Sequence, residues 1–508
     1  MLVTLALAIL LVVTASAGHA AENVFVYGVT GPPESLDSAK AFTDRSVWAT
    51  WLLCDALINI SQDGARLEPA LAESWTLSDD GLRATVRLRR GVVFHDGTPV
   101  DAAAVRSSFE RQFRLDHQLY TPEPRNTKEK LLSDLIDDIQ VQDGSTVGFK
   151  LKYPGFAYFS QIDVVGPAAL ATAGREFGRK PVCAGPFKVD RWLPDRIEMV
   201  ANDKYWGGRP RLDRVIFRFI EEQREIVERL LGGELHFTPN LRDPVFLERL
   251  RESPRVKVVS VPGLNVYYLG FYTERPPFDS RLLRRAVAQS IDVARAALFL
   301  GRGAAVAAKG PLSPAMRGYD PAVSQAAFDP DSARRLVSQA GFDVSRPLRL
   351  VHDSAVTMDA EIAGAIQRDL RQIGLKVELV GKPSSRDLVT AVRARDGDMF
   401  LYSWHLRAPY PERLLIPLFH SGASEATNLS RYRNMALDRL LDEALRLHEG
   451  PAQNALYSRT QQVIVDDAPM IFLYHLTRMA AQAQRVRGLD LNLGVLPHDK
   501  LVKVDLVP

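Results

Sequence analysis

The sequence predicts an α/β protein, with a hairpin-rich α+β region in its first half and parallel sheet in its second half. Residues 84–90 and 146–152 alternate apolar with polar or basic side chains, and each run follows an Asp-Gly turn signal. These two observations predict antiparallel hairpins. Later in the chain, a strand, a helix and a second strand follow one another within residues 348–379. This βαβ order is typical of parallel neighbours in a sheet.

Length and composition are those of an ordinary globular protein. The chain has 508 residues, of which 46% are hydrophobic and 25% charged. At roughly 150 residues per domain, this length predicts about three domains. The formal net charge is +3, from 64 basic and 61 acidic residues. A surplus of three positive charges is too small to attract a polyanion, so we expect the protein to bind neither nucleic acid nor an anionic membrane.

The N-terminal segment has the features of a signal peptide. Residues 2–13 are almost wholly apolar, and small residues follow up to Gly18-His19-Ala20. A membrane-spanning helix needs about 20 apolar residues, and this run is shorter. We therefore expect residues 1–20 to be removed by cleavage after Ala20, and the mature protein to be periplasmic.

The chain contains two cysteines, Cys54 and Cys183. An oxidising compartment permits them to pair, and two buried free thiols are the alternative. No CxxC motif or Cys/His cluster occurs, so a structural zinc site is not indicated.

In the first half, residues 23–29 read as a buried strand that precedes the two hairpin regions. Residues 121–130 are polar and contain two prolines, which predicts a surface loop.

The second half alternates helices and strands. Ser280 is expected to cap a helix with an apolar face at Leu283, Val287, Ile291, Ala294 and Leu298. Within the βαβ unit we expect a strand at 348–352, a helix at 358–373 ended by Gly374, and a strand at 375–379. Residues 398–404 are the next expected strand, with Trp404 at its carboxyl end. Ligands of open α/β sheets bind at that edge.

The motifs of common enzyme classes are absent from the sequence. There is no HExxH, no GxSxG and no Walker-type loop, and no two histidines are spaced i,i+3 or i,i+4. We expect a protein that is not an enzyme and that needs no cofactor and no metal. A secreted hydrolase and a chaperone-like envelope protein remain as alternatives. Substrate turnover would identify the first, and a lack of saturable small-molecule binding the second.

Several separated segments resemble the family 5 extracellular solute-binding proteins, which serve ATP-binding-cassette importers of peptides, nickel and related solutes. The segments are LAESWTLSDDGLRATVRLRRGVVFHDGTPVDAAAVRSSFER (71–111), PVCAGPFKVDRW (181–192), NDKYWGGRPRLDRVIF (202–217), GFYTERPPFDSRLLRRAVAQSID (270–292), ARRLVSQAGF (333–342) and YSWHLRAPYPERLLIPLFHSG (402–422). The resemblance implies a two-lobed fold like that of class II periplasmic binding proteins, with an extra inserted α+β domain.

The resemblance also implies the domain limits. The first domain combines residues 22–62, 181–266 and 487–508, the second is inserted at 63–180, and the third spans 267–486. Chain crossings near 266 and 486 act as the hinge, and the lobes close on a solute. Such a protein, expected to be a monomer, delivers the solute to an inner-membrane permease.

The likeness points to the solute site through one departure from the family pattern. Peptide-binding members carry an aspartate three residues after the tryptophan that aligns with Trp404, and it pairs with the ammonium group of the peptide. Arg407 occupies that place here, and Tyr410 replaces a second aspartate. We expect Arg407 to bind an anionic group and Trp404 to form an apolar wall, with His405 and Tyr410 beside them. The alternative is that Arg407 points to solvent and that a different acid of the chain does the work of the family's missing aspartate.

The favoured solute is therefore an anionic or carboxylate-bearing small molecule or modified short peptide, and an ordinary di- or oligopeptide is the alternative. Metal-chelate binding is less favoured. Ala408-Pro409-Tyr410-Pro411 resembles A-P-Y-D-P of nickel-type members, but the aspartate is missing. The stretch 162–170 also lacks the arginine with which those members hold a chelator. His405 and His420 remain as possible metal ligands.

The family's G-T-G-P turn, which lies near the solute, is Cys183-Ala184-Gly185-Pro186 here. We therefore expect Cys183 and Gly185 to line the pocket. The alternative is that Cys183 replaces another small residue of the family's turn without any effect on the pocket. His95 and His236 are expected to be structural.

Overall fold

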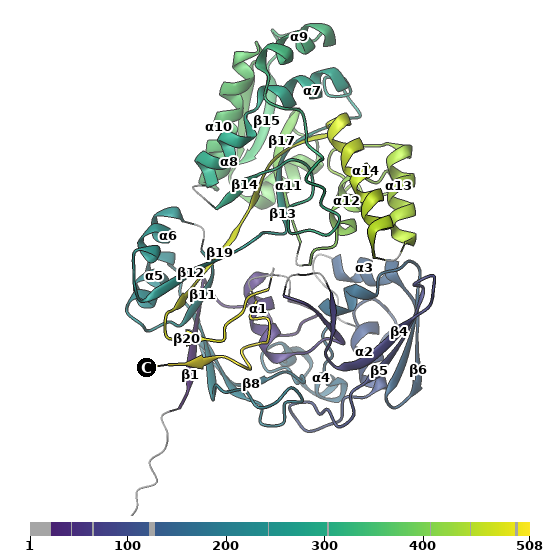
Figure 1. Cartoon of the computed structure of the whole chain (residues 1–508), viewed down its shortest axis with the longest axis vertical. Coiled ribbons are helices and arrows are strands. Elements are labelled where there is room, and N and C mark those ends of the chain that lie inside the picture. The colour runs from purple at the N-terminus through teal and green to yellow at the C-terminus, as the bar shows by residue number, and fades with distance from the viewer. Residues whose placement is uncertain are drawn as a thin grey trace, which may run out of the picture.

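The computed structural model describes residues 22–507 apart from 42, 63, 65, 121–126, 242, 302–303, 407, 448 and 493–495. The predicted signal peptide lies outside these residues. Figure 1 shows two lobes, with the third domain above and the first and second domains side by side below. The predicted α/β class with an extra α+β domain is confirmed by three main sheets of seven, six and four strands in the described chain.

The first domain is built on the seven-stranded sheet, in the order β12-β19-β11-β1-β10-β9-β8. The predicted strand at 23–29 is its central strand β1, which runs parallel to β10 and β11. The strands are β1 (Val24–Val29), β8 (Phe187–Trp192), β9 (Arg196–Ala201), β10 (Arg214–Phe219), β11 (Phe237–Leu241), β12 (Val256–Val261) and β19 (Arg478–Ala483).

Helices cover both faces of this sheet because the side chains of its strands alternate. Phe25 and Tyr27 point to a core shared with helix α1 (Asp44–Leu53), whereas Val26 packs against a second cluster. Helices α5 (Gln223–Leu231) and α6 (Pro244–Arg251) form that second cluster.

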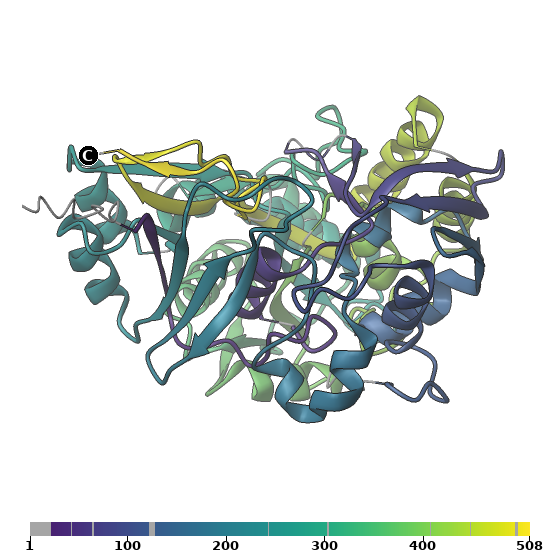
Figure 2. The same ribbon diagram turned by 90° about the horizontal axis from the view of Figure 1, so that it is seen from below.

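The sheet also shows where the chain passes between the lobes. Strand β19 pairs with β11 and β12, although residues up to 486 were expected in the third domain. We therefore propose the second crossing near Thr477. We propose the first crossing between β12 and β13 (Asn265–Phe271), close to residue 266. The C-terminal strands β20 (Val486–Arg487) and β21 (Asp505–Leu506) form a small antiparallel pair, which Figure 2 shows in yellow on the lower lobe.

The second domain contains the four-stranded antiparallel sheet in the order β4-β5-β7-β6. Both predicted hairpins are confirmed, one across Asp80-Gly81 and the other across Asp143-Gly144. The predicted loop at 121–130 is wrong for its last residues, which begin a helix, and residues 121–126 lie outside the described chain. The elements between β1 and β8, besides α1, are β2 (Ile58–Ile60), β3 (Leu67–Pro69), β4 (Ala72–Leu77), β5 (Arg83–Leu88), α2 (Ala102–Glu110), α3 (Thr127–Leu135), β6 (Ile136–Asp143), β7 (Thr146–Leu151), η1 (Phe156–Gln161), α4 (Pro167–Ala173) and η2 (Gly174–Gly178).

The third domain contains the six-stranded sheet in the order β14-β18-β13-β17-β15-β16. The predicted βαβ unit is confirmed, since β15 runs parallel to β16 and a helix connects them. The elements are β13, α7 (Arg281–Ser290), α8 (Val293–Gly301), β14 (Ala305–Ala307), α9 (Pro330–Ala340), β15 (Leu348–Asp353), α10 (Thr357–Gln372), β16 (Val377–Lys382), α11 (Ser385–Arg393), β17 (Met399–His405), α12 (Glu412–Phe419), α13 (Met435–Arg446), α14 (Pro451–Asp467) and β18 (Met470–Leu476).

One predicted helix is two helices. Ser280 caps α7 as expected, but Ile291 has extended backbone geometry and ends that helix. The Asp292 side chain then accepts a hydrogen bond from the Arg295 backbone N–H at the start of α8 (3.0 Å). The break changes the rotational phase, so Ala294 and Leu298 are exposed instead of buried.

Candidate functional site

Two cavities lie between the lobes. The interlobe cavity has a volume of about 120 Å³ and is lined from all three domains, by Ser38, Trp51, Ser160, Asp163, Ala408 and Pro409 among others. The sheet-edge cavity, about 550 Å³, is lined mainly by the third domain, including Tyr267, Asp353, Asp359, His405 and Tyr474, and by Asp44 and Arg478 of the first domain. The α1 helix borders both cavities, through Val47 and Asp44.

The sheet-edge cavity takes its position from sheet topology. Strands β15 and β17 run parallel, so their carboxyl ends, with Asp353 and His405, meet at one edge. An aromatic wall stands beside them. The rings of Tyr267 and Tyr474 stack at 4.7 Å, and His405 meets Tyr267 edge-on at 5.5 Å. The His405 Nε2 lies 3.1 Å from the Ser403 hydroxyl.

Carboxylates predominate among the charged groups of this cavity. Asp353 is 2% exposed and accepts hydrogen bonds from the Ser385 hydroxyl (2.6 Å) and the Ala355 backbone N–H (3.0 Å). Asp359, in the first turn of α10, is half-buried. Burial, and then the charge of Asp353, raise the pKa of Asp359 to about 6.

Among the described residues that line the sheet-edge cavity, Arg478 at the start of β19 is the one Lys or Arg, and His405 is the other basic side chain. Its guanidinium lies 3.8 Å from the Asp44 carboxylate of α1, and the two form an ion pair at the cavity wall. Asp44 therefore has a positive neighbour, whereas Asp353 and Asp359 line the cavity without an ion pair to any residue that the structure describes.

The interlobe cavity lies beside a direct contact between the second and third domains. The Tyr410 hydroxyl donates to the Ala157 carbonyl (3.4 Å), and its ring meets Tyr158 edge-on at 5.4 Å. Arg413 donates to the Gln161 side-chain oxygen (2.7 Å) and covers the Tyr158 ring at 5.1 Å. The lobes thus touch through these side chains.

A half-buried glutamate completes this contact. Glu412, the first residue of α12, accepts hydrogen bonds from Tyr158 of the second domain (2.9 Å) and from Tyr457 of α14 (3.2 Å). Burial raises the pKa of Glu412 above its ordinary value. The carboxyl group therefore connects one tyrosine from each side of the cleft.

The structure brings together some of the predicted site residues. Trp404 is half-buried at the end of β17, and its indole N–H donates to the Arg413 carbonyl (3.1 Å). His405 lines the sheet-edge cavity. Tyr410 is buried in the contact between domains and is not among the residues that line either cavity. Arg407 lies outside the described residues.

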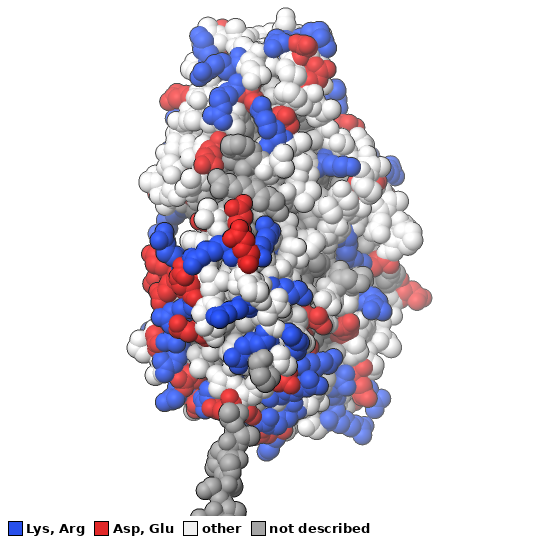
Figure 3. Space-filling model, turned by 60° about the vertical axis from the view of Figure 1, so that its left-hand side comes forward, with Lys and Arg blue, Asp and Glu red and all other residues white. Residues whose placement is uncertain are grey.

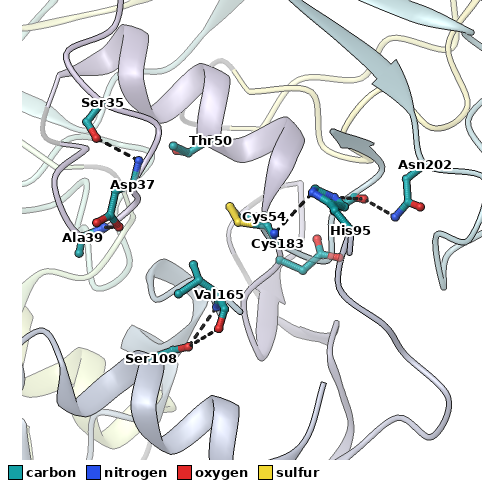
Figure 4. The surroundings of a disulfide bond; sticks show 12 residues. Ser35, Asp37, Ala39, Thr50, Cys54, His95, Ser108, Val165, Cys183 and Asn202 are labelled. Atoms are coloured by element: carbon teal, nitrogen blue, oxygen red, sulfur yellow. Dashed lines mark hydrogen bonds between the residues drawn. A yellow bond between two sulfur atoms is a disulfide. The ribbon is translucent and has the colours of Figure 1, made fainter. Parts of the chain in front are cut away.

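Cys183 and Gly185 have structural positions. Cys183 is fully buried and bonded to Cys54 at the end of α1, so the pairing alternative holds (Figure 4). A Cβ on Gly185 would lie 2.4 Å from the Leu53 carbonyl oxygen, so no larger residue fits there. The Nε2 atom of His95 lies within hydrogen-bond distance of the Gly185 carbonyl oxygen (3.1 Å) and so contacts the same turn. Neither residue is among those that line the two cavities described here, and their contact with the solute remains a prediction.

The remaining candidates do not form a metal centre in the described chain, where no group of three or more His, Cys, Asp or Glu side chains is arranged to hold an ion. His420 instead lies 3.3 Å from Asp442. His236 accepts a hydrogen bond from the Val26 backbone N–H (2.8 Å), a structural role. Among the helices that the structure describes, none is both long and apolar enough to cross a membrane. Basic and acidic side chains are interspersed over both lobes on the face in Figure 3.

Two acids of the site were missed at the level of sequence, although a signal for them exists. Asp353 ends β15, and Asp359 lies in the first turn of the following helix. Both strand and helix were predicted, and an acid at the carboxyl end of a parallel strand is well placed to meet a ligand. Ser160 and Asp163 of the interlobe cavity carry no comparable signal, since they follow no recognisable strand end.

Comparison with known proteins identifies relatives over nearly the whole chain. Heme-binding protein A of Haemophilus influenzae is 28% identical, with 93% of this chain and 90% of the relative covered. Di/tripeptide-binding protein 2 of Pseudomonas aeruginosa is 27% identical (93% and 93%), and glutathione-binding protein GsiB of Escherichia coli is 27% identical (95% and 94%).

Solved structures have the same fold. HbpA2 from Haemophilus parasuis superposes with a TM-score of 0.88 at 23% identity, covering 96% of this chain and 100% of that one. The periplasmic binding protein DppA from Helicobacter pylori, in complex with the peptide STSA, has a TM-score of 0.79 at 26% identity (95% and 98%). The family model for the middle region of bacterial extracellular solute-binding proteins of family 5 matches residues 66–426. The chain therefore belongs to the family 5 extracellular solute-binding proteins, which bind solutes for transport and are not enzymes.

Proposed function

We propose that the protein is the periplasmic solute-binding component of an ATP-binding-cassette importer and captures an anionic or carboxylate-bearing small solute or modified short peptide. The lobes close on the solute about the two crossings, and the monomer delivers it to an inner-membrane permease. Trp404, His405 and Arg407 are the proposed solute-binding residues.

The observation that carries this proposal is the place of Arg407 in the chain between two cavity-lining residues. His405 lines the sheet-edge cavity, and Ala408 lines the interlobe cavity. Peptide-binding members have an aspartate at this position, and a guanidinium there favours a carboxylate over an ammonium group. Two relatives are named for heme and glutathione, and both of these molecules bear carboxylates.

An ordinary di- or oligopeptide is the second candidate. It is favoured by the relative named for di- and tripeptides and by the solved relative that holds the peptide STSA. An unmodified peptide has one terminal carboxylate for Arg407, but its ammonium group must then find an acid elsewhere in the cleft.

Mass spectrometry separates the two candidates. The protein is purified gently from its native periplasm, its intact mass shows any retained solute, and denaturation releases that solute for identification. A carboxylate-bearing molecule other than an ordinary α-linked peptide supports the proposal. An unmodified linear peptide shows that the second candidate is correct.

A substitution then tests the role of Arg407. Arg407→Ala is expected to weaken binding of the recovered solute at least tenfold by calorimetry, which is about 1.4 kcal/mol. Arg335→Ala, at an exposed position of α9, is the matched control and should leave the affinity unchanged. Equal affinities for the Arg407 variant and the unsubstituted protein would refute the assignment of the anion to this residue.

A further inference from the structure

Among the residues that the structure describes, two carboxylates of the sheet-edge cavity lack a cationic partner. Asp359 accepts no hydrogen bond and forms no ion pair with another residue of the described chain, although it is half-buried in the cavity wall. Asp353 is almost fully buried, and its two hydrogen-bond donors, Ser385 and the Ala355 backbone, are neutral. Burial of ionised carboxyl groups without a counter-charge is unfavourable.

The nearby basic groups are engaged elsewhere. Lys382 pairs in register with Asp353 across β15 and β16, but its ammonium group lies on Asp396 (2.8 Å). Arg478 faces Asp44 across the cavity wall. Of the described cations, neither Lys382 nor Arg478 is therefore directed at Asp353 or Asp359.

The space in front of the acids suits a solute. The cavity has a volume of about 550 Å³, within the usual range for small-molecule sites of roughly 300–1,000 Å³. The stacked rings of Tyr267 and Tyr474 form one side, and Asp359 is close enough to Tyr474 to raise the pKa of its hydroxyl further, after burial and Tyr267. Carboxylates beside an aromatic wall in a partly dry cavity are a setting that stabilises an organic cation.

We infer that Asp353 and Asp359 form a cation subsite that receives an ammonium or guanidinium group of the captured solute. The inference rests on the proposed function and deepens it, because it names the chemistry at the other end of the same molecule. The solute is then amphoteric, with an anionic group and a cationic group at separate places in the cleft.

The first test is the chemical identity of the solute recovered from the native protein. The inference expects an amine or guanidine group in that molecule. A recovered solute that carries a carboxylate but no cationic nitrogen would overturn the inference and leave the proposed function standing. A recovered solute without any anionic group would contradict the proposed function instead.

The second test compares paired probes. The recovered solute, glutathione and γ-glutamylglycine are each used with the amine free and acetylated, and their affinities are measured by calorimetry. For each probe that binds, the free amine is expected to bind at least tenfold more tightly than the acetylated form. Equal affinities within these pairs would overturn the inference. Failure of the recovered solute to rebind in either form would count against the proposed function.

The variant Asp359→Asn removes the charge of this side chain and keeps its shape, and it therefore tests whether Asp359 causes the preference for the free amine. It is expected to lose most of the preference for the free amine while binding the acetylated probes unchanged. Asp331→Asn, at an exposed position of α9, is the matched control and keeps the preference. A structural role for Asp359 would lower both affinities together, and that result would refute the subsite.

Discussion

The cation subsite predicts that the protein without solute is less stable with an aspartate at position 359 than with an asparagine. The pKa of Asp359 is raised from 3.8 to about 6. At roughly 1.4 kcal/mol per pKa unit, this corresponds to about 3 kcal/mol of unfavourable free energy for the ionised folded form. Water reaches part of this half-buried side chain, so we expect about half of that, ~1.5 kcal/mol, to be gained by Asp359→Asn at pH 7.5.

The sign of the pH dependence follows from the raised pKa. Below the unfolded value of 3.8 the carboxyl is protonated in both states, and the penalty is absent. As the pH rises to 6 and above, the folded state has to ionise an unfavourable site, and the penalty is complete. The gain from Asp359→Asn should therefore be near zero below pH 4 and reach its maximum above pH 6.

The assay is denaturant unfolding of both proteins between pH 3.5 and 8, after bound solute has been removed by unfolding and refolding. Removal is necessary because a bound solute stabilises the folded state. A variant that is less stable than the unsubstituted protein at pH 7.5 would refute the reasoning. So would a stability difference that is the same at every pH, since a lost carboxylate has to act through its titration.

Three further predictions follow from contacts outside the cavity. Replacing Cys54 and Cys183 together by alanine opens a loop that spans 129 residues and should lower the free energy of unfolding by about 4–5 kcal/mol in the chain-entropy model. Calorimetric unfolding checks this, and an unchanged melting temperature contradicts it. Lys500→Met removes the ammonium group that lies 2.5 Å from the buried Asp55 carboxylate, and it should lower the free energy of unfolding by about 3–5 kcal/mol. Replacing Asp55 by Asn as well should recover part of this loss in the same assay. Tyr158→Phe removes a hydrogen bond between the lobes and should weaken solute binding by about fivefold, or ~1 kcal/mol. Small-angle scattering should show a larger fraction of open molecules. An unchanged affinity together with an unchanged scattering curve would contradict this role.

The fold could largely be predicted because its signals are local. The βαβ unit and the two hairpins each depend on side-chain periodicity within a few neighbouring residues. The break at Ile291 could not be predicted in this way, since the apolar spacing continues through it. Likewise, the membership of β19 in the first sheet depends on pairing with strands more than 200 residues earlier. Long-range pairing leaves no local mark in the sequence.

The site was predicted less completely for a related reason. The expected strand end at Trp404 and His405 is confirmed because a strand end is a local feature, and contact of these residues with the solute remains a prediction. The close packing of Gly185 against the end of α1 could not be predicted, because only the folded chain shows this contact. The proposed role of Asp353 and Asp359 depends on the absence of a basic partner among the described residues, and that too appears only in three dimensions.

The seven-stranded sheet has a consequence for the order in which the chain can fold. Its central strand β1 ends at residue 29, but β19, which pairs with two of its strands, ends at residue 483. The sheet therefore cannot be complete until almost the whole chain has reached the compartment in which it folds. The four-stranded sheet, by contrast, is complete by residue 151. The inserted domain can therefore be native while the sheet that carries it is still waiting for its last strand, and the exposed edges of β11 and β12 are where a chaperone would be needed.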